Sequence, residues 1–446
     1  KMEKKENKQE IKLTFKNPYL KMALNVVTGV YLIWKWKTQS QNILQHALVP
    51  LTFAHYAFEW GIVRPPVTMI PLYLAQHIGM WTNRMKLAIG LYLVSQIAQG
   101  ILKEQQELLP NPTGKHKEIG VRLLKSKRDK RLQCLVYYPS TKNIDRRQRK
   151  QNKKNNYDQT GEHQLYFSYQ KQFESMIDNM GENLTKKIAN ALFPYMMYIK
   201  TRAKWNMEIK EDKKKYKVIL FSHGFYGIPE NYRAYINELV SQGNVVVAPY
   251  HTDGSAMHVA LEEETIPFKP IEKEQYKERT TERIQNLEDA AYIFENYPEF
   301  KKHIDLSRIV AIGHSYGGGT VAGQLMNTEL KGNDEDTPRL VGGIVMDSWM
   351  EPLKDIKKKY NAPLLSLHSS IWKWEGNETA RADVDELNAY ETQSMTLPET
   401  GHHNFNDFSF IQPFFFWLSK GIGKANVART MERQFTAIHQ FLKNLQ

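Results

Sequence analysis

The chain has 446 residues, 41% hydrophobic and 24% charged, so it can bury a substantial core and is long enough for one large α/β domain with an additional region. Its formal net charge of +13 suits an anionic partner surface, either a membrane or a nucleic acid. The single cysteine, Cys134, excludes an intrachain disulfide and fits a reducing compartment. Because Cys134 lies in a strand-like run, we expect a small buried hydrophobe there and no catalytic thiol.

The N-terminal quarter is apolar apart from a polar segment at residues 1–20. That segment mixes lysine with glutamate and lacks the apolar centre of a signal peptide. Within residues 21–103, four apolar segments follow, at 22–34, 38–58, 65–83 and 87–102. Each is marginal for a span of about 20 residues, but four in succession with basic, Trp and Tyr flanks predict a helical, membrane-embedded region. The alternative is a soluble helical bundle or a scaffold that packs on a partner.

From residue 109 to residue 446 short apolar runs alternate with helical patterns. The strand candidates are QCLVYY, KVILFS, NVVVAP, RIVAIG, GGIVMD and APLLSL. Apolar and polar residues hardly alternate in these runs, which indicates strands buried on both faces. Ile284, Leu287, Ala291 and Phe294 recur at helical spacing. Strand–helix alternation predicts an α/β domain with a mostly parallel sheet, in which ligands bind beyond the carboxyl ends of the strands.

A basic insert interrupts this domain at residues 142–156, with the sequence KNIDRRQRKQNKKNN. It is nearly free of apolar residues, which is typical of a solvated insertion. A nuclear signal or a nucleic-acid patch is the functional alternative. No zinc spacing, P-loop or RNA-binding signature accompanies it, so we expect no nucleic-acid partner.

The stretch IVAIGHSYGGGTV places Ser315 between glycines, after a strand-like run and before a helix-like one. Gly-x-Ser-x-Gly in this context predicts a nucleophile elbow, a tight turn that exposes the serine hydroxyl above a sheet. The alternative is a strand-to-helix turn that only needs small residues. A serine hydroxyl is a poor nucleophile without a base, so the prediction requires an acid and a base further along the chain.

Both follow in the order that α/β-hydrolases use. Asp347 lies just beyond a strand candidate, 32 residues after Ser315, and His402 lies in a predicted loop 55 residues later. In this scheme Ser315 attacks a carbonyl, His402 is the base, and Asp347 orients the imidazole. The alternatives are a helix-capping aspartate and a polar loop histidine, and His403 is the rival base.

Backbone amides at two strand ends are the predicted oxyanion donors. Phe225 follows the strand candidate KVILFS, and Tyr316 follows the nucleophile directly; two such donors would stabilise a tetrahedral intermediate. His223 and His314 are interpreted as turn or packing residues. No cluster has the ligand spacing of a zinc site, so we expect no metal.

Seven blocks between about residues 109 and 410 resemble one family: LPNPTG, LVYYPS, AKWN, VILFSHGFYG, GHSYGGGTV, MDSWMEPL and HHNFNDFSF. They resemble the platelet-activating-factor acetylhydrolases, also called lipoprotein-associated phospholipases A2, which have the α/β-hydrolase fold. The resemblance implies Ser315 as nucleophile, Asp347 as acid, His402 as base, and Phe225 and Tyr316 as oxyanion donors. It favours His402 because relatives usually have glutamine at the position of His403.

The resemblance also implies a calcium-independent esterase that removes short or oxidised acyl chains from the sn-2 position of glycerophospholipids, without a cofactor. The chain departs from the family pattern near Asp253, where relatives usually have two arginines and this chain has Thr252 and Gly254. That difference puts the local ion pairing or the substrate preference in doubt. The insert at 142–156 is a second departure.

The leading hypothesis is therefore a membrane-associated serine esterase acting on phospholipids, with an anionic lipid surface as partner and an intracellular location, the mitochondrial inner membrane being one candidate. A second hypothesis is a structural or accessory subunit of a larger membrane assembly, with protein partners, that has kept a hydrolase fold. A third is a carboxylesterase of another substrate class, because a fold alone does not fix a substrate.

Overall fold

The structure is a computed structural model that describes residues 109–145, 161–178, 196, 199–261, 264–354, 358–388, 392–411, 416 and 419–445. These residues belong to one compact unit. The polar segment at 1–20 and the helical region predicted at 21–103 lie outside them, as does the basic insert beyond Asp145. Across the described residues, no helix combines the length and the apolar character that a membrane crossing needs.

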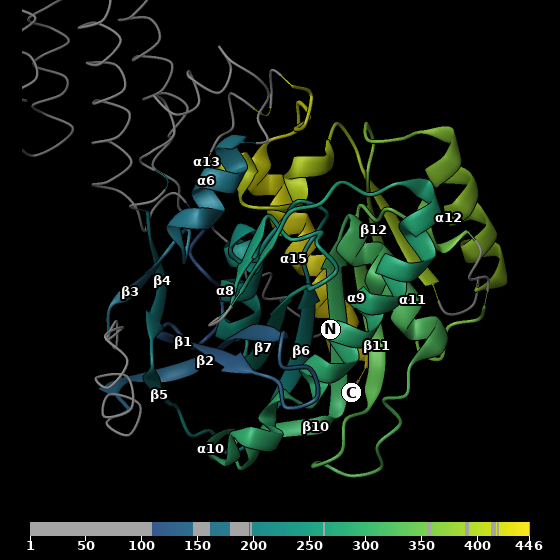
Figure 1. Cartoon of the computed structure of the whole chain (residues 1–446). Coiled ribbons are helices and arrows are strands. Elements are labelled where there is room, and N and C mark those ends of the chain that lie inside the picture. Colours follow the sequence, from purple (N-terminus) through teal and green to yellow (C-terminus); the bar gives the residue numbers. More distant parts are fainter. Residues whose placement is uncertain are drawn as a thin grey trace, which may run out of the picture. The chain divides into compact units, whose positions relative to one another are not determined.

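A large mixed sheet forms the centre of the unit (Figure 1), with the strand order β13-β12-β11-β10-β6-β7-β2-β1-β4-β3 and β5 beside β2. Its strands are β1 (Ile119–Lys125), β2 (Gln133–Ile144), β3 (His163–Leu165), β4 (Lys200–Trp205), β5 (Met207–Ile209), β6 (Tyr216–Ser222), β7 (Asn244–Tyr250), β10 (Ile304–His314), β11 (Leu340–Met346), β12 (Leu364–Ser369) and β13 (Thr392–Leu397). A separate hairpin pairs β8 (His258–Ala260) with β9 (Thr265–Pro267).

All six predicted strands are present, and the sheet is mostly parallel as expected. Strands β7, β6, β10, β11, β12 and β13 run parallel to their neighbours in that order. The run QCLVYY opens β2, which instead pairs antiparallel with both β7 and β1. The sequence pattern could not show this reversal, because a strand that is buried on both faces has the same composition in either direction.

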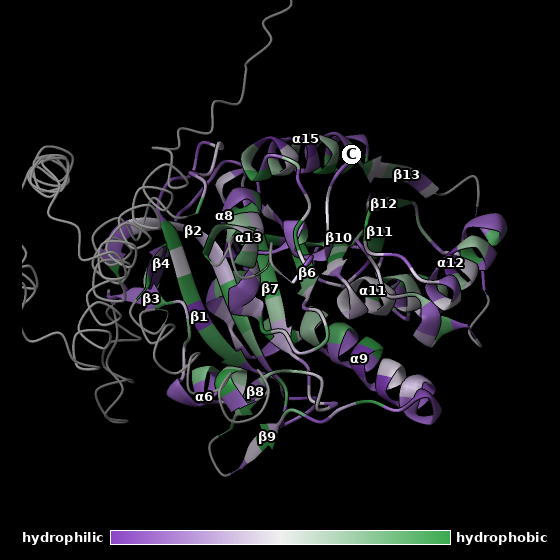
Figure 2. Cartoon of the chain, turned by 90° about the horizontal axis from the view of Figure 1, so that it is seen from above, coloured by the Kyte–Doolittle hydropathy of each residue, from purple (hydrophilic) through white to green (hydrophobic). Residues whose placement is uncertain are grey.

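Helices cover both faces of the sheet: Figure 2 shows α8 (Arg233–Ser241) and α15 (Val427–Asn444) on one side and α9 (Tyr276–Ala291) and α11 (Tyr316–Asn327) on the other. The helix α12 (Glu375–Leu387) lies near the β12 and β13 edge. The remaining helices are short: α6 (Gln170–Asp178), α10 (Pro298–Lys301), α13 (Phe408–Ile411), η3 (Pro229–Tyr232), η4 (Lys273–Gln275), η5 (Ile293–Asn296), η6 (Glu351–Leu353) and η7 (His402–Phe405).

The helix predicted from the spacing of Ile284, Leu287 and Ala291 is α9, and all three side chains are buried. Leu287 and Ala291 join one hydrophobic cluster with side chains of β6 and β10. Phe294, the fourth predicted position, lies beyond the end of α9 in η5 and is buried in the same cluster. The periodic pattern therefore located the buried face correctly and overran the helix end by three residues.

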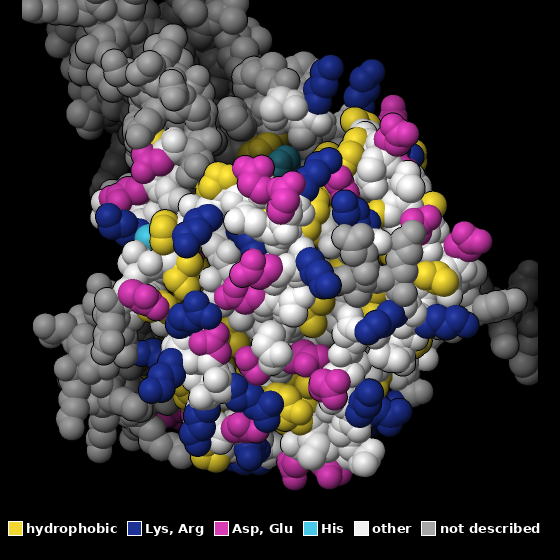
Figure 3. Space-filling view, turned by 45° about the vertical axis from the view of Figure 1, so that its right-hand side comes forward, with side chains coloured by type: hydrophobic (Ala, Val, Ile, Leu, Met, Phe, Trp, Pro, Cys, Tyr) yellow, Lys and Arg dark blue, Asp and Glu magenta, His cyan; other side chains and the backbone are white. Residues whose placement is uncertain are grey.

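The outer surface mixes charges of both signs. On the face shown in Figure 3, lysine and arginine side chains are interspersed with aspartate and glutamate. Ion pairs such as Arg128 with Glu295 and Lys302 with Glu211 join neighbours of opposite charge on the surface.

The start of α11 packs directly on the end of β6. A Cβ atom on Gly317 would lie 2.1 Å from the carbonyl oxygen of Ser222 and 2.6 Å from that of His223. These carbonyl oxygens belong to the backbone and cannot move aside as the end of a flexible side chain can. Glycine at this position therefore allows α11 to approach the sheet closely.

The substitution Gly317→Ala is expected to lower the free energy of unfolding by about 2–4 kcal/mol, because either α11 or β6 must shift. Urea denaturation measures the change. Gly376→Ala in α12 is the matched control: there the nearest atom to the added Cβ is a carboxylate oxygen of Glu351, at 3.2 Å. It should change the free energy by no more than about 1 kcal/mol. Equal stability of both variants would contradict the packing described here.

Candidate active site

Ser315 occupies a sharp turn between β10 and α11. Its φ of 58° and ψ of −123° lie in a region that non-glycine residues rarely adopt, at a cost of about 1–3 kcal/mol. Three backbone hydrogen bonds hold the turn: the Ser315 amide donates to the Met346 carbonyl (3.0 Å), and the Ser315 carbonyl accepts from Gly319 (3.1 Å) and Trp349 (2.9 Å). The turn predicted from the glycine-flanked serine is therefore present.

Asp347 follows β11 and is also in a positive-φ conformation, at 45°. One carboxylate oxygen accepts a hydrogen bond from the Ser369 amide (2.7 Å), and the other lies 2.8 Å from Nδ1 of His402. Burial raises the pKa of Asp347, and the hydrogen bond from Ser369 opposes that shift. The predicted helix-capping alternative does not describe this carboxylate, because its oxygens bind a histidine and the end of β12.

His402 lies in the short helix η7 rather than in an irregular loop. Two rings enclose its imidazole: Trp372 stacks at 3.7 Å between centroids and 22° between planes, and His314 lies at 4.4 Å and 34°. Since two rings cannot share one face at these distances, they cover opposite faces. Burial lowers the pKa of His402 to about 3. The ring is therefore neutral near pH 7, with Nδ1–H directed at Asp347 and a lone pair left on Nε2.

His403, the rival base, points elsewhere. Its Nδ1 lies 2.9 Å from Nδ2 of Asn406, and its ring packs against Phe416 and Phe408. Of the two adjacent histidines, the structure brings only His402 into hydrogen-bond contact with Asp347.

The two predicted amide donors belong to Phe225, which follows Gly224, and to Tyr316, which follows the serine. The Gly224 carbonyl accepts a hydrogen bond from the Gly227 amide (3.0 Å); in a planar trans peptide this turns the Phe225 N–H the opposite way. Gly224 is close to the serine, since a Cβ there would lie 3.1 Å from Cβ of Ser315. Tyr316 is the first residue of α11, where an N–H has no partner within the helix. Within the described part of the chain, neither amide donates to a protein acceptor.

A series of hydrogen bonds connects the backbone before Phe225 with the helix η7 that carries His402. The hydroxyl of Tyr232 accepts a hydrogen bond from the Gly224 amide (2.9 Å) and lies 2.9 Å from Nδ1 of His314. The other ring nitrogen of His314 lies 3.1 Å from the His402 carbonyl oxygen. The sequence predicts a turn or packing role for His314, and the structure also places it between Tyr232 and His402.

The ion pairing at Asp253 is supplied from α9. Asp253 Oδ2 lies 3.4 Å from Nε of Arg279, and Oδ1 lies 3.9 Å from Nη1 of Arg283. These contacts answer the doubt about ion pairing that Thr252 and Gly254 raised, because arginines from another element pair with the carboxylate. Their spacing of four residues in ERTTERIQN, which places both on one helix face, is the signal that sequence reasoning missed.

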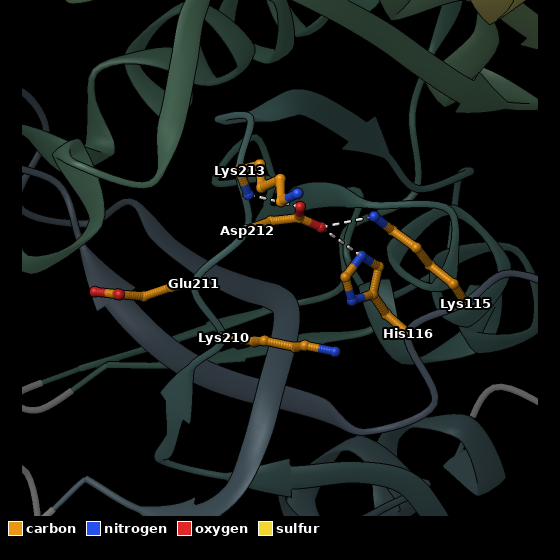
Figure 4. Close-up of a pocket in the computed structure, with 6 residues that line it drawn as sticks. All are labelled: Lys115, His116, Lys210, Glu211, Asp212 and Lys213. Carbon is orange, nitrogen blue, oxygen red and sulfur yellow. Dashed lines mark hydrogen bonds and ion pairs between the residues drawn. The ribbon is translucent and has the colours of Figure 1, made fainter.

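A separate polar pocket of about 470 Å³ lies near the amino end of β6 (Figure 4). It is lined by Lys115, His116, Lys210, Glu211, Asp212 and Lys213. Within it, Asp212 lies 2.7 Å from Nζ of Lys115 and 3.3 Å from Nε2 of His116. The pocket is at the amino end of β6, whereas Ser315, Asp347 and Phe225 follow the carboxyl ends of their strands. In the described residues no group of three His, Cys, Asp or Glu side chains could hold a metal ion.

The mostly parallel sheet, the helices on both faces and a strained serine at a strand-to-helix turn define an α/β-hydrolase fold. The sequence model of the family described as "Platelet-activating factor acetylhydrolase, isoform II" matches residues 101–290 and 280–446. The chain therefore belongs to this family, as the resemblance in its motifs predicted.

Individual relatives carry the same name. The platelet-activating factor acetylhydrolase of Cavia porcellus is 27% identical over 276 residues, which cover 55% of this chain and 60% of that protein. The Bos taurus protein of that name is 28% identical over 259 residues, covering 51% and 55%. The chain thus spans a little over half the length of these relatives. A ferulic acid esterase from Streptomyces cinnamoneus shares the fold, with a TM-score of 0.52 at 16% identity over 75% of this chain and 91% of that one.

Proposed function

We propose that the chain is a carboxylic ester hydrolase in which Ser315, His402 and Asp347 form the catalytic triad. The observation that carries the proposal is the 2.8 Å contact between Nδ1 of His402 and Asp347, together with the strained turn at Ser315, whose amide donates to the carbonyl of Met346, the residue before Asp347. Ser315 Oγ attacks the ester carbonyl while Nε2 of His402 takes its proton. The same proton then passes to the leaving alcohol, and water releases the acid from the acyl-enzyme by the reverse sequence.

The surroundings of His402 support this assignment of roles. Asp347 accepts the Nδ1 proton and so selects the tautomer whose Nε2 can act as base. When Nε2 gains a proton, the Asp347 carboxylate stabilises the imidazolium cation. The amides of Phe225 and Tyr316 would bind the oxyanion of the tetrahedral intermediate, and their lack of protein acceptors in the described residues leaves both free for that task.

The proposed substrate is a glycerophospholipid with a short or oxidised acyl chain at sn-2, and the proposed hydrolysis needs no calcium. Family membership supports the substrate class, together with relatives named as acetylhydrolases of platelet-activating factor. Calcium independence follows from the scheme, since nucleophile, base, orienting acid and oxyanion donors are all protein groups. The helical membrane region predicted at 21–103 lies outside the described residues and stays a prediction. An anionic lipid partner and an intracellular location are likewise predictions for the whole protein.

The purified chain should release acetate from a 1-alkyl-2-acetyl glycerophosphocholine in the presence of a calcium chelator, and at the same rate without it. A matched 2-oleoyl lipid tests the preference for short acyl chains and should react at least about tenfold more slowly. Activity that needs added calcium would contradict the proposed mechanism. A folded protein that hydrolyses neither phospholipids nor p-nitrophenyl esters would favour the accessory-subunit hypothesis, and hydrolysis of the p-nitrophenyl ester alone would favour another substrate class.

The pH dependence of kcat/KM should show an acid limb with its midpoint below 6.5. His402 must be neutral to accept the serine proton, and burial lowers its pKa from 6.5 to about 3; the active form therefore persists as the pH falls. Rates with p-nitrophenyl acetate between about pH 4 and about pH 9 give the profile, and circular dichroism at each pH verifies folding. A midpoint at or above 6.5 in folded protein would contradict the described burial.

A further inference from the structure

Arg283 is a fully buried cation directly behind the candidate active site. Its side chain extends from α9 and has an exposed fraction of 0%. A buried guanidinium is costly unless charge and hydrogen bonds compensate it. All three of its nitrogens donate hydrogen bonds. Ser222, His223 and Thr320 lie on the two segments that carry the proposed oxyanion donors, and Ser255 follows β7 and bonds to the first of these segments.

The first segment is the end of β6 and the turn that follows it. Nη2 of Arg283 donates to the carbonyl oxygen of His223 and to Oγ of Ser222, the latter at 3.2 Å. Nη1 donates to Oγ of Ser255, and the Ser255 carbonyl in turn accepts from the amide of Tyr226 at 2.8 Å. The guanidinium therefore fixes the backbone on both sides of Phe225.

The second segment is the first turn of α11. Nε of Arg283 donates to Oγ1 of Thr320 (2.8 Å), and that hydroxyl donates to the carbonyl oxygen of Tyr316 (2.8 Å). The guanidinium carbon also lies 4.5 Å from the centre of the Tyr316 ring, within the range of a cation–π interaction. The residue whose amide is the second proposed donor is thus held through both its backbone and its side chain.

Asp253 holds the cation in place. Its Oδ1 lies 3.9 Å from Nη1 of Arg283 and accepts hydrogen bonds from the hydroxyl (2.5 Å) and the amide (3.2 Å) of Ser255. Asp253, Ser255 and Arg283 therefore contact one another and form one buried hydrogen-bonded cluster next to the turn that contains Phe225.

We propose that Arg283 is the positioning residue of the oxyanion hole, because one rigid guanidinium sets the distance between the Phe225 and Tyr316 amides. This inference rests on the proposed esterase function. Substitution by lysine keeps the charge opposite Asp253 and removes the fork of donors. Because complete loss of one oxyanion donor typically costs about 10²–10³ in rate, Arg283→Lys is expected to lower kcat by about 10–100-fold and to change KM by less than about twofold.

The test measures kcat and KM for p-nitrophenyl acetate, with thermal unfolding of each variant. The matched control is Arg122→Lys: Arg122 on β1 is also buried and pairs with Asp145 (2.7 Å) and Glu299 (3.1 Å), away from the carboxyl ends of the strands. Both substitutions should destabilise the fold, but Arg122→Lys should leave kcat within about twofold of wild type. Equal losses of kcat in the two variants would overturn the inference, because the effect would then reflect stability alone.

Two further variants keep the inference testable if Arg283→Lys fails to fold. Thr320→Val removes the hydroxyl between Arg283 and the Tyr316 carbonyl and should lower kcat by about 3–10-fold with KM held; an unchanged kcat would overturn the inference. Added guanidinium at about 20 mM, far below denaturing concentrations, should raise the kcat of Arg283→Ala at least about tenfold. Urea, which carries no charge, should leave the kcat of this variant unchanged. A wild-type chain without esterase activity would overturn the proposed function together with this inference, whereas an active wild type with a fully active Arg283→Lys would overturn the inference alone.

Discussion

Ser315→Ala is expected to lower kcat for p-nitrophenyl acetate by about 10⁴–10⁶-fold, because it removes the nucleophile while binding and the oxyanion donors remain. The free energy of unfolding should stay within about 1 kcal/mol of wild type, since alanine is not larger than serine and the turn is held by backbone hydrogen bonds. Steady-state kinetics and urea denaturation measure the two quantities.

Ser307→Ala is the matched control for that substitution. Ser307 lies on the same strand, β10, toward its amino end, and its hydroxyl donates to Asp305. Its replacement should leave kcat within about twofold of wild type. Hydrolysis that survives Ser315→Ala at more than about one hundredth of the wild-type rate would show that another group is the nucleophile.

His402→Ala is expected to lower kcat by about 10⁴–10⁶-fold, because Ser315 and the base act as a unit and loss of either disables both. His403→Ala should lower kcat by less than about tenfold, since the His403 ring packs on Phe416 and Phe408 and hydrogen-bonds to Asn406. The pair compares two adjacent histidines of the same helix η7, so differences in folding should be small compared with the difference expected in rate.

The result that would contradict the assignment is the reverse order, with the larger loss in His403→Ala. Added imidazole provides an independent check, because it can occupy the space left by the His402 ring and act as base. Activity of His402→Ala should rise with imidazole concentration, and that of Ser315→Ala should not.

The strands, and the positions of the site residues after strand ends, could be predicted because both depend on short stretches of sequence. Runs such as NVVVAP bury both faces, and every residue of β7 is buried. Each site residue follows a strand or a short turn, so its place at the carboxyl edge of a parallel sheet follows from the strand itself. The antiparallel direction of β2 depends on its pairing with β7 and β1, and composition carries no sign of that direction.

The contacts around the site could not be predicted, because they join elements far apart in the chain. Trp372 stacks on His402 from the loop after β12, and IWKW in a polar segment has no periodicity that indicates a partner. The residues alone predicted His402 as the base but left His403 as its rival, since two neighbouring residues of one turn differ in the direction of their side chains. Arg283 is one of many charged residues in α9, and only the packed structure shows that it is buried against Ser222, Ser255 and Thr320.

The central claim is that Ser315 is an activated nucleophile in the folded chain. The most direct test is reaction of the purified native protein with a fluorophosphonate probe, followed by peptide mass spectrometry, with Ser315→Ala and heat-unfolded wild type as controls. We expect one phosphonylated serine, Ser315, in native wild type and no labelling in either control. Folded wild-type protein that stays unlabelled, or that is labelled at another serine, would contradict the account.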